Sequence, residues 1–176
     1  SYTGTILSNS PAVHVYKDAR TLERTCDTMH IRIDEIVKNK ADVEKLGIGN
    51  GDFIAIDPKT TITGSGFIKS RFLDDKVSVA ILFGLLKTIA TENIKPQHNL
   101  QLIISTYEEV GHGSSYISNQ ISELIAVDMG CIGLDLSCSE YDVSICAKDG
   151  SGPYDYEMTT RLINLAKENN LQYAVD

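Results

Sequence analysis

Residues 74–90 have the sequence DDKVSVAILFGLLKTIA, and we take this stretch as the starting point. Its apolar residues cover almost the whole circumference of the helix that it predicts, so we expect this helix to be buried on most sides. The helix opens with Asp74 and Asp75, at the end where the helix dipole favours carboxylates. The stretch therefore predicts a helix packed inside the protein, with two acids at its start.

Beyond this helix, the chain alternates apolar runs with a second helical pattern. Residues 100–106, 124–127 and 143–146 are short and apolar, as buried strands are, and residues 156–169 form an amphipathic helix pattern. Such alternation is typical of a sheet with covering helices. We therefore predict an α/β domain over residues 67–176, built on a mixed, mostly parallel sheet.

Residues 1–66 have a different sequence pattern, with many turn residues and strand-like runs. Residues 29–34 alternate with a period of two, residues 53–56 form a second strand candidate, and residues 42–46 predict one or two helical turns that stop at Gly47. The pattern of residues 1–66 therefore predicts a small, barrel-like β domain.

Composition narrows the classes of function. The chain has 176 residues and a net charge of −8, which argues against nucleic acid as a partner. It contains no run of about 18 apolar residues, and its start does not resemble a signal peptide, so we expect neither a membrane span nor secretion. Four cysteines without a C-x-x-C pair predict reduced, mostly packed thiols in a cytoplasmic protein.

Acidic residues stand where the predicted strands end. Glu108 and Glu109 follow residues 100–106, and Asp128 follows residues 124–127 directly. Ligands of open α/β sheets bind at the carboxyl ends of the strands, so these acids lie where a site is expected. Asp74 joins them if the segment before it is also a strand.

These acids are consistent with metal binding or acid–base chemistry. Neighbouring residues on a strand point to opposite sides, so Glu108 and Glu109 would do different jobs, one holding a cation and the other handling a proton. Several carboxylates in one pocket repel each other unless a positive charge neutralises them, and a divalent metal would do so. Each acid alone is also consistent with a solvated turn. His112, in the loop after Glu109, could line the site or lie at its rim.

Three motifs then occur in order: SRFLDDK at 70–76, YEEVG at 107–111 and AVDMG at 126–130. This set resembles the glutamyl aminopeptidase family of zinc or cobalt peptidases, which form tetrahedral particles and are also described as endoglucanase homologues. Residues 148–155 look like the same family, so the resemblance covers essentially the whole chain. It implies a zinc-peptidase-like, incomplete catalytic domain and a β domain that carries dimer contacts, with dimers assembling to a dodecamer.

The resemblance also implies roles for individual residues. Asp74 looks like the carboxylate that bridges two divalent metals, Glu109 like a ligand of one metal and Asp128 like a ligand of the other. Zinc or cobalt is favoured, and manganese is compatible. Glu108 looks like the general base. Asp75 and His112 are candidates for supporting the ligands or contacting the substrate, and the Asp74–Asp75 peptide is similar to one that is cis in such enzymes.

Two histidines of the family pattern are missing here. No His-x-Asp precedes Asp74, and no histidine follows His112, although the family has one histidine for each metal. We therefore expect this chain to be a fragment of a longer peptidase, or a polypeptide missing its ends, with an incomplete metal site. This chain alone should bind metal weakly and hydrolyse no peptides, whereas the full-length protein should release N-terminal residues from short peptides.

Two other classes of function remain open. A glycoside hydrolase would use Glu108 or Glu109 with Asp128 as an acid pair and would need no metal. A scaffold without catalytic activity would use the same surface to bind a partner.

Overall fold

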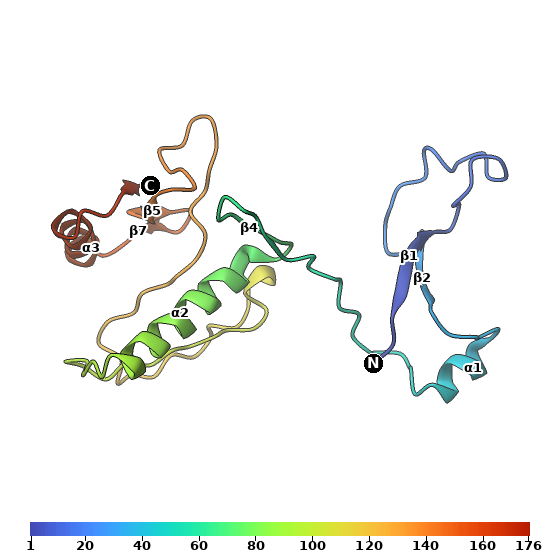
Figure 1. The fold of residues 1–176 in the computed structure, drawn as a ribbon, viewed down its shortest axis with the longest axis horizontal. Coiled ribbons are helices and arrows are strands. Elements are labelled where there is room, and N and C mark those ends of the chain that lie inside the picture. Colours follow the sequence, from blue (N-terminus) through green and yellow to red (C-terminus); the bar gives the residue numbers. More distant parts are fainter. The chain divides into compact units, whose positions relative to one another are not determined.

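The computed structural model describes residues 1–176, which divide into two compact units, Ser1–Ile56 and Asp57–Asp176. Figure 1 shows the elements of each unit. The chain has the α/β composition that the sequence predicts, with helices and small sheets in mixed order. It contains four two-stranded sheets and no closed barrel. The barrel-like β domain and the single large sheet therefore stay predictions.

The first unit is built on one hairpin. β1 (Gly4–Ser8) pairs antiparallel with β2 (Met29–Ile33), and alternate residues of β2 are half-buried, as its period-two pattern predicts. α1 (Lys40–Lys45) begins at Asn39, whose side chain accepts a hydrogen bond from the Asp42 amide at 3.1 Å. The strand predicted at residues 53–56 is wrong, because no neighbouring strand pairs with it and Phe53 is 97% exposed.

The second unit opens with a hairpin and a long helix. β3 (Thr61–Ile62) and β4 (Ile68–Lys69) pair antiparallel, and α2 (Leu73–Thr91) follows. The peptide between Asp74 and Asp75 is cis, as the family resemblance implied, and the backbone of these two residues is not helical. The strand before Asp74, which the sequence analysis left open, is present as β4, although it is short.

A βαβ arrangement forms the end of the second unit. β5 (Val143–Ile145) pairs in parallel with β8 (Tyr173–Val175), and α3 (Tyr156–Glu168) connects them along the chain. Between β5 and α3, β6 (Lys148–Asp149) and β7 (Gly152–Pro153) form a tight hairpin. α3 packs on β5, and two of the buried apolar residues, Ile145 and Ala166, come from these two elements.

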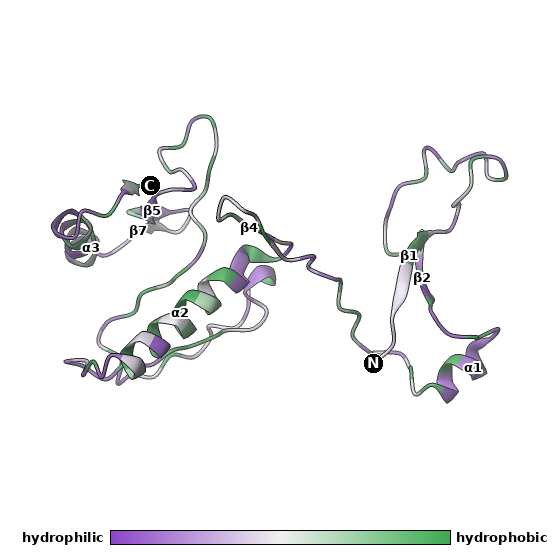
Figure 2. Ribbon diagram, viewed as in Figure 1, coloured by the Kyte–Doolittle hydropathy of each residue, from purple (hydrophilic) through white to green (hydrophobic).

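The helix predicted at residues 74–90 is present as α2, but its predicted burial is wrong. Ser78 is its one buried residue, because no other helix or strand packs extensively along it. Figure 2 shows hydrophobic residues along this helix, and Ile81 and Phe83 are 58% and 57% exposed. No helix of the structure has the length and apolar character needed to cross a membrane.

The strands predicted at residues 100–106 and 124–127 are also wrong in this structure. Both segments lack strand pairing, since no neighbouring backbone forms a ladder with them. A short 3₁₀ helix, η1 (Glu108–Val110), follows the first segment. All four cysteines are free as predicted, but Cys138 alone is buried, so the expectation that most are packed is wrong.

We expect α3 to depend on the cap at its start. Asp155 Oδ1 accepts a hydrogen bond from the Met158 amide at 2.7 Å. Replacing Asp155 with alanine removes this acceptor and should lower the free energy of unfolding by about 1 kcal/mol, as measured by urea denaturation followed by circular dichroism. Asp155→Asn keeps an acceptor and serves as the control. Equal stability of the alanine variant and the parent chain would contradict a role for this cap.

Candidate functional site

The candidate acids come from three separate parts of the second unit. Asp74 and Asp75 lie at the start of α2, Glu108 and Glu109 in η1, and Asp128 follows an extended segment. The backbone turns sharply just before η1, where Tyr107 has a left-handed φ of 62°, and just after it, where Gly111 has a φ of 78°. These turns reverse the chain, and the amide of His112 donates to the Tyr107 carbonyl at 2.9 Å.

The negative charges of the other acids raise the pKa of Glu109. The negative charge of Asp74 is the largest cause of a raised pKa at Glu109, followed by burial and by the charges of Glu108, Asp128 and Asp75. Charges at a protein surface interact mainly within a screening length of about 8–10 Å. The acids that the sequence analysis singled out are thus the ones whose charges act on Glu109.

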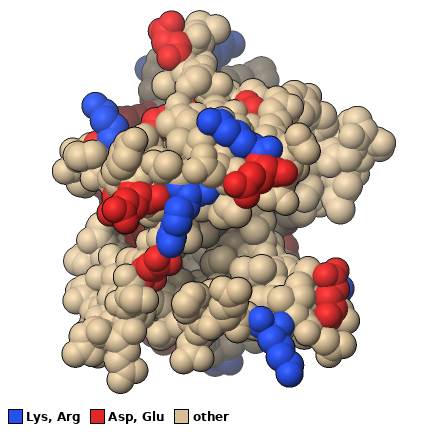
Figure 3. All heavy atoms as spheres, turned by 90° about the vertical axis from the view of Figure 1, so that its left-hand side faces the viewer, with Lys and Arg blue, Asp and Glu red and all other residues tan.

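Glu109 differs from Glu123 in that no cation is among the charges that shift its pKa. Glu123 forms an ion pair with Arg161 at 2.9 Å, and the hydrogen bond from Arg161 lowers the pKa of Glu123. On the face shown in Figure 3, acidic and basic side chains are similarly interspersed. Every charge that shifts the pKa of Glu109 is negative. The site around Glu109 is therefore one that a positive group would stabilise.

The cluster does not form a complete metal site. No three His, Cys, Asp or Glu side chains lie close enough together to hold a metal ion. Asp128 Oδ1 instead accepts a hydrogen bond from the Met129 amide at 2.7 Å, and Asp75 Oδ1 is buried without a partner. Carboxylate oxygens are thus ligands of the type that divalent cations bind, but too few of them lie close together to hold one. The assignment of Asp74, Glu109 and Asp128 as ligands stays a prediction.

The histidines do not complete the cluster. His112 is exposed in the loop after η1, and His30 Nδ1 lies 2.8 Å from Asn9 Oδ1 in the first unit. A role for Asp75 or His112 in supporting ligands or contacting substrate likewise stays a prediction.

The sequence reasoning did not assign a role to the pair formed by Asp149 and Tyr154. The Tyr154 hydroxyl donates to Asp149 Oδ2 at 2.6 Å, and this hydrogen bond is the main cause of the raised pKa of Tyr154. The charge of Asp128 makes a smaller contribution to the same shift in pKa. Asp149 ends β6, within residues 148–155, which the sequence analysis noted only for their family resemblance.

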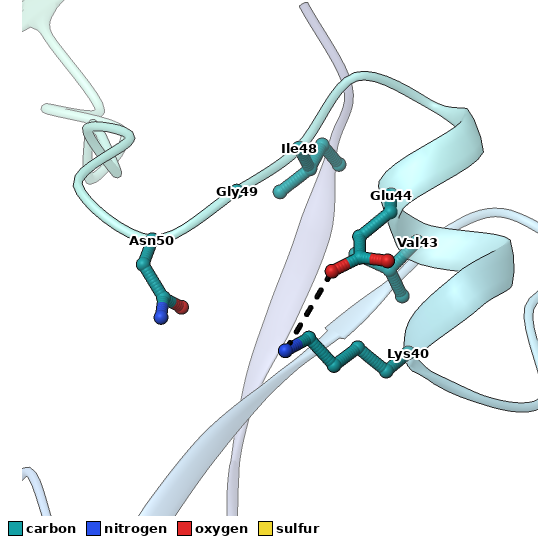
Figure 4. Close-up of a pocket in the computed structure, with 6 residues that line it drawn as sticks. All are labelled: Lys40, Val43, Glu44, Ile48, Gly49 and Asn50. Atoms are coloured by element: carbon teal, nitrogen blue, oxygen red, sulfur yellow. Dashed lines mark ion pairs between the residues drawn. The ribbon is translucent and has the colours of Figure 1, made fainter.

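The first unit contains a pocket of its own. Lys40, Val43, Glu44, Ile48, Gly49 and Asn50 line it. Figure 4 shows the ion pair that joins Lys40 to Glu44, with a separation of 3.6 Å. None of the candidate acids lines this pocket, so it adds nothing to their chemistry.

Comparison with known proteins gives the class to which this arrangement belongs. The family model described as M42 glutamyl aminopeptidase matches residues 1–176. The chain therefore belongs to the M42 glutamyl aminopeptidase family. It is 50% identical over 176 residues to a protein of Bacillus subtilis (strain 168) named "Putative aminopeptidase YhfE", and the match covers 99% of this chain. The chain spans about half the length of this curated relative, 51%.

We expect the pKa of Glu109 to respond to the charge of Asp74. In the metal-free chain, Asp74→Asn should lower the pKa of Glu109 towards its ordinary value, as followed by NMR titration of its carboxyl carbon. A carboxyl with a raised pKa binds more protons in the folded state than in the unfolded one. It therefore makes stability fall as the pH rises from the ordinary pKa to the raised one, and Asp74→Asn should weaken this fall.

Asp57→Asn is the matched control, because Asp57 lies in the same unit but does not contribute to the shift of Glu109. An unchanged pKa of Glu109 in Asp74→Asn would contradict the effect of the Asp74 charge on Glu109.

Proposed function

We propose that this chain carries the catalytic carboxylates of a metal-dependent aminopeptidase, which releases N-terminal residues from short peptides. The observation that carries the proposal is the family match over all of residues 1–176. The raised pKa of Glu109 is in keeping with it, because the charges that raise it belong to acids that the family resemblance singles out. The name of the Bacillus subtilis relative is in keeping with this activity.

The metal ligands that we propose are Asp74, Glu109 and Asp128. Asp74 would be shared by two divalent metals, with Glu109 completing one site and Asp128 the other. Carboxylate oxygens suit zinc, cobalt and manganese. Enzymes usually hold zinc with three protein ligands, so each site needs a further ligand beyond these three residues. Bound metal would supply Lewis acidity, which lowers the pKa of a water molecule and polarises the peptide carbonyl.

Glu108 is the general base in this proposal. It lies next to Glu109 in η1 and is exposed, so it is open to an incoming peptide. As a carboxylate, it can accept a proton from the attacking water and return that proton to the nitrogen of the leaving amine. Asp75 supports the site from beside Asp74, through the buried oxygen that has no partner within the chain.

The rest of the proposal concerns the whole protein. Residues 67–176 contribute to a zinc-peptidase-like sheet, and residues 1–66 carry dimer contacts from which a dodecamer is built. The free thiols fit a reducing compartment such as the cytoplasm.

A chimera tests the function of Glu108. In it, this chain replaces the matched half of the Bacillus subtilis relative. We expect the chimera to hydrolyse leucine or glutamate anilides and to lose this activity with EDTA. Glu108→Gln should lower kcat by about 10²–10⁴-fold, the usual contribution of a general base, without abolishing metal binding.

Glu123→Gln is the control for this substitution, since it makes the same chemical change at an exposed acid paired with Arg161. It should retain kcat within about twofold, because a surface ion pair contributes little. Activity that survives EDTA would point instead to a glycoside hydrolase, and full activity of Glu108→Gln would exclude it as the base.

The isolated chain should behave differently from the chimera. With no three ligands gathered, we expect it to bind zinc or cobalt weakly in calorimetry and to show no chelator-sensitive anilide hydrolysis. Asp74→Asn should weaken the residual binding further, because it removes the shared ligand. Robust hydrolysis by the isolated chain would overturn the proposal that the site is incomplete.

A further inference from the structure

A turn in the first unit contains the one place in the chain where a glycine directly follows an asparagine. Asn50 and Gly51 are both exposed and form the centre of this turn. The Asp52 amide donates to the Gly49 carbonyl at 3.3 Å, and the Gly49 amide donates to Asp52 Oδ2 at 2.7 Å. Gly51 has a φ of 97°, which glycine adopts readily. The hydrogen bonds of the turn therefore join its two outer residues and not the two central ones.

The reactive groups of the two central residues are open to each other and to water. The Gly51 amide donates to no acceptor of the chain. In Figure 4, the Asn50 carboxamide lies apart from the ion pair between Lys40 and Glu44. A Cβ placed on Gly51 would meet no atom within 4 Å, so the space beside this residue is open. Nothing in the folded chain therefore holds the Gly51 nitrogen or the Asn50 side chain in place.

An asparagine side chain can react with the backbone nitrogen of the residue that follows it. A bond from that nitrogen to Cγ closes a five-membered ring, and groups already held this close react far faster than separate molecules do. A side chain on the second residue hinders the approach, whereas glycine has none and reaches more backbone conformations. Asn50 and Gly51 therefore have the residue types, the exposure and the freedom from hydrogen bonds that this reaction needs.

Asn9, in the same unit, shows the opposite arrangement. Asn9 Nδ2 donates to the Asp27 carbonyl at 3.2 Å, and Asn9 Oδ1 lies 2.8 Å from His30 Nδ1. The next amide, that of Ser10, donates to Ser8 Oγ at 3.2 Å, and Ser10 is 8% exposed. Reaction at Asn9 would require these hydrogen bonds to open first, which lowers its rate.

The remaining asparagines are also less suited to ring closure. The amide that follows the asparagine donates a hydrogen bond at Asn93, Asn119, Asn169 and Asn170. Residues with long side chains follow Asn39, Asn99 and Asn164. Asn50 is therefore the asparagine at which the residue type and the structure both favour the reaction.

We propose that Asn50 is a site of spontaneous deamidation, at which the chain modifies itself without an enzyme. The Gly51 nitrogen loses its proton to water and forms a bond to Asn50 Cγ. The bond from Cγ to Nδ2 breaks, and ammonia leaves with a proton taken from the solvent. The resulting cyclic imide then takes up one water molecule at either of its two carbonyls. Opening one C–N bond gives aspartate, and opening the other gives isoaspartate, in which the main chain runs through Cγ.

The modification changes both the charge and the backbone of the turn. A carboxylate replaces a neutral carboxamide, so the net charge of −8 becomes more negative by one. This carboxylate arises beside the pocket that Glu44 also lines. The isoaspartyl form adds one main-chain carbon between Gly49 and Asp52, the two residues that the hydrogen bonds of the turn join. The modified chain therefore has a more acidic pocket and a longer turn.

Peptide mapping of the native chain tests the proposal. The chain is incubated at mildly alkaline pH and digested with trypsin at intervals, and the peptides 46–59 and 1–17 report on Asn50 and Asn9 by mass spectrometry. We expect deamidation at Asn50 to be at least about tenfold faster than at Asn9, because groups held by hydrogen bonds react only when the structure opens locally. The product should contain both aspartate and isoaspartate. Equal rates at the two sites, or aspartate alone, would overturn the proposal.

Unfolding separates the effect of the structure from that of the residue type. In guanidinium chloride at the same pH, Asn9 loses its hydrogen bonds and should react at least about tenfold faster than in the native chain. The rate at Asn50 should change by less than about threefold, because the folded turn leaves its groups free. A rate at Asn50 that rises on unfolding as much as the rate at Asn9 would show that the turn protects it, and would overturn the proposal.

Two glutamine substitutions test the assignment to Asn50 in the intact chain. Asn50→Gln lengthens the side chain, so ring closure needs a larger ring, and the acidic form seen by ion-exchange chromatography should appear at least about tenfold more slowly. Asn119→Gln makes the same change at another exposed asparagine, whose following amide donates to Ser118 Oγ, and should keep the parent rate within about twofold. Equal rates in the two variants would overturn the assignment. Neither readout depends on metal or turnover, so failure here is distinct from failure of the proposed aminopeptidase activity.

Discussion

Repulsion among carboxylates is the physical constraint at the site proposed for this chain. Asp74, Glu108 and Asp128 all raise the pKa of Glu109, and no basic side chain offsets them. Elsewhere in the chain, an acid such as Glu123 has an arginine partner that lowers its pKa. A folded chain that gathers like charges without a counter-ion loses stability at neutral pH, so such a cluster is expected where a cation takes part in function.

The metal site proposed for this chain is not closed in this structure. Carboxylates that repel one another do not come within coordinating distance of a common point unless a cation or further neutral ligands hold them there. No three potential ligands converge in this chain, and none of its histidines joins the cluster.

Local sequence was sufficient to predict several elements. α2 and α3 follow from apolar periodicity and capping residues, and β2 follows from strict alternation, because each signal acts within a few residues of the chain. Residues 100–106 and 124–127 have strand-like sequences of the same quality, yet they form no strands. A strand differs from a helix in that its hydrogen bonds go to another segment, so its sequence alone cannot supply them.

The sequence by itself determined the family, the acids to consider and the helices, because motifs, residue types and short-range periodicity are properties of the chain order. Only the tertiary structure decided that the charges of acids at the starts and ends of separate elements act on Glu109. It also decided that the Tyr154 hydroxyl donates to Asp149, and that α2 stays exposed. These facts depend on which distant segments meet, and such contacts are set by long-range packing that no local pattern encodes.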